Sequence, residues 1–429
     1  MSKNVVIVGG GLAGLAASIY LARGGRTVTV FEKRRYLGGR AITQLRHGYR
    51  FNLGAHAFYR GGAGAAVCKE LGIPVRGVIP KPKAIALING QERRLPTTVL
   101  SLLGTSLLSL RGKAQLGRAL WRIRRIERNP PAPSQTVREW LDEQVSDPRA
   151  RQVLEALIRL ATYSNRADTA SAALALAQMK IALRGTVYVH EGWQRIIDAM
   201  HSTAISAGVN FVSSSRIVGV DTDGDEVRAI RLGGLEIDAD RMDTQAVAFP
   251  EMTPEAVDGA RLPAQTVILA VDPATASELT GQNWAATPIT AACLDVALRA
   301  LPNPKRTFAL GIDDPLYFAV HSAWAQLTPK GGALIHSVKY GGTSADEPAL
   351  EGLLDRMQPG WRDLVVHRRF MPALTVSNAL VTPNVPRPAA VANVKGLYLA
   401  GDWVGDEGLL SDAALASART AAKAVLANA

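Results

Sequence analysis

The chain has 429 residues, 47% of them hydrophobic and 20% charged, so it is too long for one ordinary core and too apolar for a disordered protein. It lacks any run of about eighteen apolar residues, which argues against a membrane span, and its only cysteines, Cys68 and Cys293, lie too far apart to indicate a disulfide framework. The formal net charge is +12, but no zinc spacing, RNP-like aromatic pattern or helix-turn-helix signature accompanies it, so we expect no nucleic-acid partner.

The N-terminal residues also lack the long apolar segment of a signal peptide. Together with the two cysteines this indicates a reducing compartment, and we expect a cytoplasmic protein.

Residues 5–31 predict a strand, a glycine turn, a helix and a second strand. The turn and the start of the helix read Gly9, Gly11, Leu12, Ala13 and Gly14, with the glycines in G-x-G-x-x-G spacing. In such a unit the first glycine makes the tight turn, the second lets a pyrophosphate approach the backbone, and the third lets helix and strand pack closely. The helix N-terminus offers free N–H groups to an anion. The motif predicts a dinucleotide site without deciding between NAD and FAD.

Two features after the second strand extend this prediction. Glu32, with Lys33 beside it, ends the strand 21 residues after Gly11, where a carboxylate can bind ribose hydroxyls. Gly38, Gly39 and Arg40 follow, and two bare backbone N–H groups with a guanidinium suit a second phosphate.

The segment "LGGRA" (residues 37–41) followed by "LGAH" (residues 53–56) resembles the flavin-containing amine oxidases, the protoporphyrinogen oxidases and the phytoene desaturase type of carotenoid enzymes. The resemblance implies that FAD is the cofactor and that the paired glycines lie on it. It also implies that Gly54, Ala55 and His56 approach the isoalloxazine ring, although His56 is equally well explained as a loop histidine with satisfied hydrogen bonds.

Residues 97–128 form a leucine-rich stretch broken at Gly104 and then a basic one. Leu116, Ala119, Leu120, Ile123 and Ile126 share one helical face among arginines. One interpretation is a helix pair that contacts an anionic membrane peripherally. The other is a cap that packs its leucines on its own domain and solvates its arginines.

Three aromatic residues, Tyr163, Tyr188 and Trp193, are candidates for a substrate pocket, with plain core packing as the alternative. Trp193 stands where the resembled family usually has a second glycine. The same resemblance implies backbone contacts to the cofactor at Ile217 and Ala270. The seven histidines are scattered, without an i, i+4 pair, so we expect no metal site.

Near the C-terminus, "LYLAGDW" predicts a buried strand that ends in Gly401-Asp402 and precedes a helix starting near Ser411. In the resembled class this acid and amide hold the ribityl–pyrophosphate link. The following helix, with Ser411, Asp412 and Ala413 at its start, points at the flavin pyrimidine and stabilises negative charge there. Because no cysteine lies near this segment, we expect FAD to be bound non-covalently.

We therefore expect an α/β fold with a Rossmann-type, GR2-like FAD-binding domain and an inserted substrate domain made of a mixed sheet and helices. The FAD domain would comprise residues 1–75, 190–275 and 388–429, and the substrate domain, with a helical cap, residues 76–189 and 276–387.

The expected function is hydride transfer from a small, mostly apolar substrate to flavin N5, as in phytoene desaturase-like dehydrogenation, with O2 or a quinone as acceptor. An amine or protoporphyrinogen-type oxidase and a redox-neutral flavin isomerase are the alternatives. The strand "ITAACLDVAL" (residues 289–298) lacks the lysine that such amine oxidases usually carry, which disfavours amine oxidation. No catalytic residue is identified.

Overall fold

Strands from both ends of the chain form one parallel sheet in the computed structural model, which describes residues 4–96, 99–233, 259–284, 286–385, 387–389 and 393–428. Its five strands run in the order β10 (Asn210–Val212), β2 (Thr27–Phe31), β1 (Asn4–Val8), β14 (Val267–Leu269) and β20 (Leu397–Leu399). All four neighbouring pairs are parallel. The N-terminal strand and the "LYL" strand are thus separated by a single strand, although nearly the whole chain lies between them in sequence.

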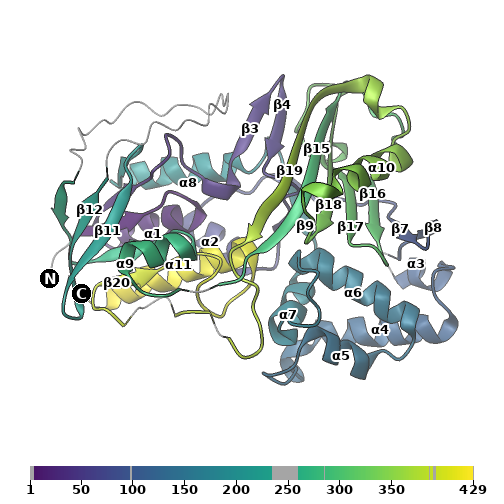
Figure 1. Cartoon of the computed structure of the whole chain (residues 1–429), viewed down its shortest axis with the longest axis horizontal. Coiled ribbons are helices and arrows are strands. Elements are labelled where there is room, and N and C mark those ends of the chain that lie inside the picture. Colours follow the sequence, from purple (N-terminus) through teal and green to yellow (C-terminus); the bar gives the residue numbers. More distant parts are fainter. Residues whose placement is uncertain are drawn as a thin grey trace.

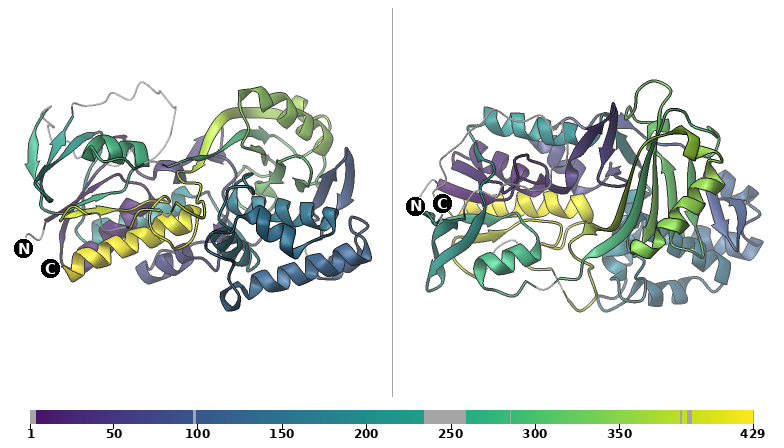
Figure 2. Two further views of the ribbon diagram at one scale, coloured as in Figure 1. Left: turned by 60° about the horizontal axis from the view of Figure 1, so that its bottom comes forward. Right: turned by 45° about the horizontal axis from the view of Figure 1, so that its top comes forward.

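Helices cover this sheet because its strands are apolar on both faces. Those that contact its strands are α1 (Leu12–Arg23) and α11 (Leu410–Ala427), while α2 (Ala63–Leu71) packs against α11 and α8 (Gln194–Ser206) packs against α1. The two chain ends meet again here, since α11 lies beside α1 (Figures 1 and 2). Gly24 ends α1 without a side chain, and a Cβ there would come within 2.4 Å of Leu426 at the end of α11.

A second, seven-stranded mixed sheet forms the other half of the molecule (Figure 1). Its order is β19 (Val365–Ser377), β15 (Ile289–Leu298), β18 (Ala333–Tyr340), β17 (Leu316–Val320), β16 (Phe308–Gly311), β7 (Ile85–Ile88) and β8 (Gln91–Arg94). Only the β16–β7 pair is parallel. The strands alternate, so that Ala292 and Leu294 pack toward α10 (Glu347–Met357), whereas Ala291 and Cys293 face the other way.

A layer of helices covers that other face and lies below the sheet in Figure 1. It comprises α3 (Val99–Gly104), α4 (Leu110–Arg124), α5 (Val137–Gln144), α6 (Pro148–Thr162) and α7 (Ala172–Ala182). For the apolar helical face described above, the interpretation as a cap is correct, because Leu116, Ala119 and Ile123 of that face are buried in this layer. Residues 97–98 lie outside the described residues.

Short elements complete the fold. They are β3 (Thr43–Arg46), β4 (Tyr49–Asn52), β5 (Phe58–Tyr59), β6 (Gly77–Val78), β9 (Thr186–Val189), β11 (Ile217–Asp223), β12 (Glu226–Leu232), β13 (Arg261–Pro263) and α9 (Pro273–Thr280). Among the described residues, no helix combines the length and the apolar character needed to cross a membrane.

The observed architecture confirms the predicted fold class, a Rossmann-type α/β unit combined with a mixed-sheet and helical unit. Strands of the parallel sheet all come from the ranges predicted for the FAD domain, and strands of the mixed sheet from the ranges predicted for the substrate domain. The exact domain limits stay a prediction. Residues 1–3, 234–258, 285, 386, 390–392 and 429 of those ranges lie outside the described residues.

Candidate functional site

A cavity of about 770 Å³ extends from the carboxyl ends of the parallel strands to the inner face of the mixed sheet. Cavities that bind small molecules in proteins usually measure about 300–1,000 Å³. The predicted site residues that line it are Gly9, Gly11, Leu12, Ala13, Glu32, Lys33, Gly38, Gly39, Arg40, Ala55, His56, Tyr163, Trp193, Ile217, Ala270, Gly401, Asp402 and Ser411. Gly14, Gly54, Tyr188, Asp412 and Ala413 do not line it, for the reasons given below.

The glycine turn has the geometry that its spacing predicts. Gly9 has a φ of +106°, and a Cβ on Gly14 would lie 1.9 Å from the Gly9 carbonyl oxygen, so Gly14 permits close packing rather than contacting a ligand. A Cβ on Gly11 would meet no atom within 4 Å, because Gly11 faces the open cavity. No side chain caps the N-terminus of α1, and its first turn holds no acid. The turn therefore presents uncapped N–H groups to an anion in the cavity.

Glu32 is fixed at the cavity edge by two backbone donors. Its carboxylate accepts hydrogen bonds from the Gly10 N–H at 2.7 Å and the Arg34 N–H at 2.9 Å. Burial raises the pKa of Glu32, and these two donors oppose that rise. Each oxygen makes one protein contact and retains acceptor capacity, which is the chemistry that paired ribose hydroxyls require.

The paired glycines close over the same turn. The Gly38 N–H donates to the Gly10 carbonyl at 2.9 Å, and a Cβ on Gly39 would lie 3.6 Å from the Gly11 Cα. Arg40, which follows them, makes an ion pair with Asp402 at 2.8 Å and donates to the Val376 carbonyl at 3.0 Å. Its guanidinium thus bridges the glycine loop, the end of β20 and strand β19.

Asp402 is only 4% exposed and is fully engaged by the protein. Besides Arg40, it accepts hydrogen bonds from the Asn378 backbone N–H at 3.0 Å and from the Asn378 side-chain amide at 2.9 Å. Gly401 is held by Ser417, whose hydroxyl accepts from the Gly401 N–H at 2.9 Å. No local pattern in the sequence indicates this contact between Ser417 and Gly401.

The N-terminus of α11 reaches the cavity through Leu410 and Ser411. Asp412 and Ala413, which follow Ser411, do not line the cavity, and their predicted contact with the cofactor stays a prediction. The Asp412 carboxylate is buried and accepts from the Gly64 N–H at 2.8 Å. Burial raises the pKa of Asp412 to about 6.

His56 and Trp193 form one wall of the cavity, with their rings edge to face at a centroid distance of 5.1 Å. Nδ1 of His56 donates to the Gly54 carbonyl at 3.2 Å, and burial lowers the pKa of His56 to about 4, so the ring is neutral at pH 7. Gly54 lies behind this wall. A Cβ there would meet Leu374 at 2.7 Å and Cys293 Sγ at 3.5 Å, so Gly54 permits the loop to approach the mixed sheet.

The mixed sheet and α6 form the far end of the cavity, which carries no charge. Its lining side chains from the described residues of these elements are Tyr163, Ala291, Cys293, Val338, Leu374, Thr375 and Val376. The charged lining residues all belong to the segments around the parallel sheet. The Tyr163 hydroxyl donates to the Ala55 carbonyl at 2.8 Å, which fixes the ring at the junction between the two ends.

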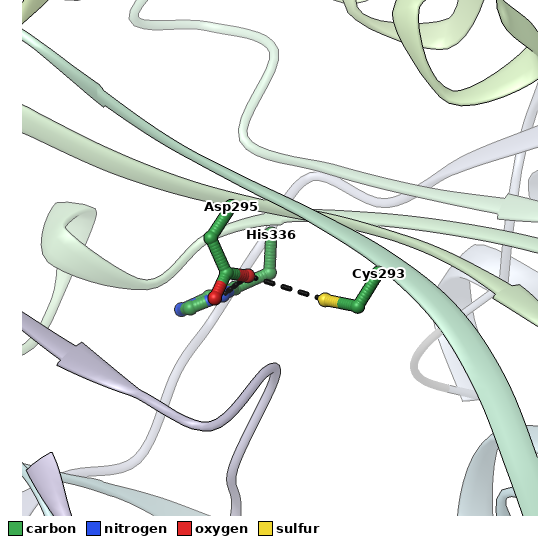
Figure 3. Close-up of side chains that lie close together, drawn as sticks. All are labelled: Cys293, Asp295 and His336. Atoms are coloured by element: carbon green, nitrogen blue, oxygen red, sulfur yellow. Dashed lines mark hydrogen bonds and ion pairs between the residues drawn. The ribbon is translucent and has the colours of Figure 1, made fainter. Parts of the chain in front are cut away.

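Behind this end lies a buried polar cluster that no local sequence pattern indicates (Figure 3). Asp295 accepts from Cys293 Sγ at 3.1 Å, from His336 Nδ1 at 2.6 Å and from Arg369 at 2.6 Å. Burial opposes ionisation, yet the hydrogen bonds from His336 and Arg369 hold the pKa of Asp295 well below its usual range. Cys293 lines the cavity, but burial and its hydrogen bond to the Asp295 carboxylate raise its pKa, so it remains a thiol.

Cys, Asp and His are also metal ligands, and the three ligand atoms lie within 4.8 Å of one another. The contacts of 2.6 and 3.1 Å are hydrogen-bond distances, however, and the Arg369 guanidinium already supplies the positive charge beside Asp295. Among the described residues, this is the one group that could hold a metal ion, and its geometry is that of a hydrogen-bonded charge cluster.

Of the three aromatic residues predicted as substrate-pocket candidates, Tyr188 does not line the cavity. Its ring stacks on His321 at a centroid distance of 3.9 Å, and its hydroxyl lies 3.4 Å from the Tyr317 hydroxyl. It is buried among these groups, so the alternative interpretation as core is correct for this residue.

The residues present fit FAD as the group that would fill the charged end. A bare glycine faces the cavity at the uncapped start of α1, a carboxylate with free acceptor capacity lies at the end of β2, and a second uncapped helix, α11, begins at the cavity. Together these donors and acceptors suit a pyrophosphate, a ribose and an electron-rich ring in one extended ligand. The assignment of individual residues to parts of FAD stays a prediction.

Comparison with known proteins agrees with a flavin cofactor. Residues 12–292 match the model of the flavin-containing amine oxidoreductase family. A Mycobacterium tuberculosis protein named as a flavin-containing monoamine oxidase, AofH, is 35% identical over 129 residues, which are 30% of this chain and 27% of that protein. A 1-hydroxycarotenoid 3,4-desaturase of Flavobacterium is 46% identical over 56 residues, 13% of this chain and 12% of the desaturase. The matched segments thus span about a quarter or less of these relatives.

Among solved structures, an oxidoreductase from Methanosarcina mazei superposes with a TM-score of 0.76 at 18% identity. The superposition covers 98% of this chain and 100% of that protein. At this identity the likeness concerns the fold alone.

Proposed function

Because the chain belongs to the flavin-containing amine oxidoreductase family, with FAD as its cofactor, we propose that it is an FAD-dependent oxidoreductase acting on a mostly apolar substrate. The reaction proposed is a phytoene desaturase-like dehydrogenation, with O2 or a quinone as the final acceptor. The observation that carries this proposal is the uncharged far end of the cavity, continuous with the FAD-type end.

An apolar substrate suits this end because, among the described lining residues, the side chains of the mixed sheet and Tyr163 carry no charge that could pair with a charged ligand group. Ala291, Val338 and Leu374 supply apolar walls, while Tyr163 and Thr375 are uncharged. A charged ligand group placed in such surroundings would lose its hydration without gaining an ion pair, which is strongly unfavourable. An isoprenoid or similar hydrocarbon would lose only unfavourable contact with water.

When bound, FAD supplies the hydride acceptor, and the protein supplies position and environment. Tyr163, Trp193 and His56 lie between the two ends of the cavity and would fix the orientation of the substrate carbon. No base is assigned for the proton that dehydrogenation also releases. His56 is a weak base, with its pKa lowered to about 4, and burial raises the pKa of the Tyr163 hydroxyl far above neutrality.

Amine oxidation is the second candidate, and the similarity to AofH is the observation that favours it. Among the described residues that line the far end of the cavity there is no carboxylate that would attract an ammonium group, and β15 presents Cys293 rather than a lysine. These features favour the apolar substrate. A redox-neutral isomerisation would use the same cavity and differs only in leaving the flavin oxidised at the end of the reaction.

Anaerobic mixing of the purified flavoprotein with detergent-solubilised acyclic polyprenes, porphyrinogens and amines separates these reactions. The proposal expects polyprenes to bleach the flavin absorbance and to yield a product with one more double bond, and reoxidation by O2 or a quinone to restore the colour. Bleaching by amines alone would refute the apolar-substrate assignment. Conversion of a polyprene without bleaching or consumption of an acceptor would indicate an isomerase.

A pair of variants tests the far end directly. Leu374→Gln places an amide in the apolar wall, whereas Leu374→Met conserves volume and polarity. The glutamine variant should lower kcat/KM for the polyprene about tenfold or more, since an unpaired buried amide costs about 1–3 kcal/mol, while retaining FAD. Leu262→Gln, at a half-exposed position on β13, is the matched control. Equal kinetics in all three variants would contradict this location of the substrate.

A further inference from the structure

Helix α4 presents two faces, of which only one is used within the protein. Gly112, Leu116, Ala119 and Ile123 form its buried face. Leu110 and Trp121 are 85% and 54% exposed, even though they belong to the most apolar residue types. They are eleven residues apart, which is about three full turns at 3.6 residues per turn, so they share one face, roughly 16 Å apart along the axis. That face points away from the buried one.

The end of α3 extends this exposed face. Leu103 is 65% exposed, and the neighbouring Lys113 of α4 donates through Nζ to the Leu103 carbonyl at 2.7 Å. This bond holds the end of α3 against α4. We call the exposed apolar residues of these two neighbouring helices, Leu103, Leu110 and Trp121, the α4 stripe. In the left view of Figure 2, α4 lies along the outer edge of the helical layer, and no other helix or strand of the described residues lies outside it.

Basic side chains border the α4 stripe on both sides. Between residues 111 and 128 they are Arg111, Lys113, Arg118, Arg122, Arg124, Arg125 and Arg128, against the single acid Glu127. Glu127 pairs with Lys180 of α7, so it does not neutralise them. Arg125 stacks over the Trp121 ring at 4.4 Å. Within the described residues, none of these arginines forms an ion pair.

We propose that the α4 stripe docks the protein peripherally on an anionic lipid bilayer. The arrangement is that of an interfacial helix, in which Trp and Leu enter the boundary between headgroups and acyl chains while arginines bind anionic headgroups. A nucleic-acid surface would use the same charge, but exposed Leu103 and Leu110 add nothing to phosphate binding, whereas they lower the free energy in a bilayer. The proposal is independent of the substrate assignment.

Flotation of the full-length flavoprotein with vesicles tests this proposal. Vesicles of phosphatidylcholine alone should not carry the protein, whereas vesicles that also contain phosphatidylserine should carry it at low salt and release it at high salt. Tryptophan fluorescence should shift to shorter wavelength on binding, because Trp121 leaves water. Absence of flotation on phosphatidylserine vesicles at low salt would overturn the proposal, as would binding to duplex DNA without binding to vesicles.

Matched variants locate the contact. Each charge removed near an anionic surface should weaken binding about fivefold, so Arg118→Gln, Arg124→Gln and Arg125→Gln together should weaken it about a hundredfold. Leu110→Ser with Trp121→Ser should weaken it at least roughly tenfold and abolish the fluorescence shift.

The control variants sit on the other half of the molecule. Lys69→Gln with Lys423→Gln removes exposed charges on α2 and α11, and Ile205→Ser removes a 47% exposed side chain on α8. All of these variants alter exposed positions, and far-UV circular dichroism and flavin content should stay unchanged. Equal loss of binding in the controls would place the contact elsewhere and overturn the assignment to α4.

Discussion

Asp412 offers the sharpest test of the electrostatics, because its carboxylate is 2% exposed and has one described hydrogen-bond donor, the Gly64 N–H. The loop packs closely against this carboxylate, since a Cβ on Gly62 would lie 2.1 Å from it. Burial raises the pKa of Asp412 from 3.8 to about 6, and the negative charge of Glu407 acts in the same direction. The folded protein therefore binds a proton at Asp412 more tightly than the unfolded chain does.

The sign of the pH dependence follows from linkage. The folded-state pKa lies above the unfolded value, so ionised Asp412 destabilises the fold, and this penalty grows as the pH rises from about 4 to about 6 and is complete above that. A shift of about two units corresponds to about 3 kcal/mol. Asp412→Asn removes the titration but keeps an oxygen that can accept from Gly64. Any cost of burying its amide group is independent of pH, so the pH dependence is the quantity to measure.

The assay is the melting temperature of the flavoprotein between pH 4 and pH 8 in saturating FAD. For a chain of this length, 3 kcal/mol corresponds to about 3 °C, from an unfolding entropy of roughly 2.1 cal/mol/K per residue. The difference between Asp412→Asn and the wild type should therefore rise by about 3 °C across this range. Asp168→Asn, at a carboxylate whose side chain is 63% exposed, is the surface control. A flat profile for Asp412→Asn would refute the assignment of a buried, titrating carboxyl group.

Other predictions concern the cavity. Gly11→Ala should fold normally but lose FAD, because its Cβ enters the cavity. Gly14→Ala should instead lower the yield of folded protein, because its Cβ would lie 1.9 Å from a backbone oxygen. Circular dichroism and flavin content distinguish the two results. Glu32→Ala and Asp402→Ala should each weaken FAD binding by about 1.5–3 kcal/mol in titrations of apoprotein, and fully yellow purified variants would contradict the proposed cofactor geometry. Cys293 should resist alkylation at pH 8, since burial and its carboxylate partner raise its pKa, and rapid stoichiometric labelling of the native protein would contradict that arrangement.

The cofactor end of the cavity could be predicted because its determinants are local. Gly9, Gly11 and Gly14 act through turn and helix geometry within a few residues, so spacing alone indicates their roles. Glu32 follows β2 directly and Asp402 lies three residues after the end of β20, and parallel strands bring their carboxyl ends to one edge of the sheet. For these residues, secondary structure and topology together are enough to place the functional groups.

The polar cluster and the fate of Tyr188 could not be predicted, because both depend on long-range pairing. Cys293 and Asp295 occupy alternate positions on β15, and their partners come from β18 and β19 through registers that no local pattern specifies. His336 is directly opposite Asp295 in that register. Tyr188 similarly ends beside His321 only because β9 lies against the mixed sheet, and a sequence of scattered histidines gives no sign of this contact.

The ion pair between Arg40 and Asp402 links the two predicted cofactor motifs in a way that neither motif indicates alone. With its further bonds to Asn378, the Asp402 carboxylate is satisfied by the protein itself. Glu32 has only two backbone donors and keeps free acceptor capacity. Removing the Asp402 side chain therefore leaves the Arg40 guanidinium and the Asn378 donors without this acceptor and should lower the stability of the protein even without FAD. Removing the Glu32 side chain should chiefly weaken the binding of FAD. A lower melting temperature of the apoprotein for Asp402→Ala than for Glu32→Ala would show that the chain's two ends are joined before the cofactor binds.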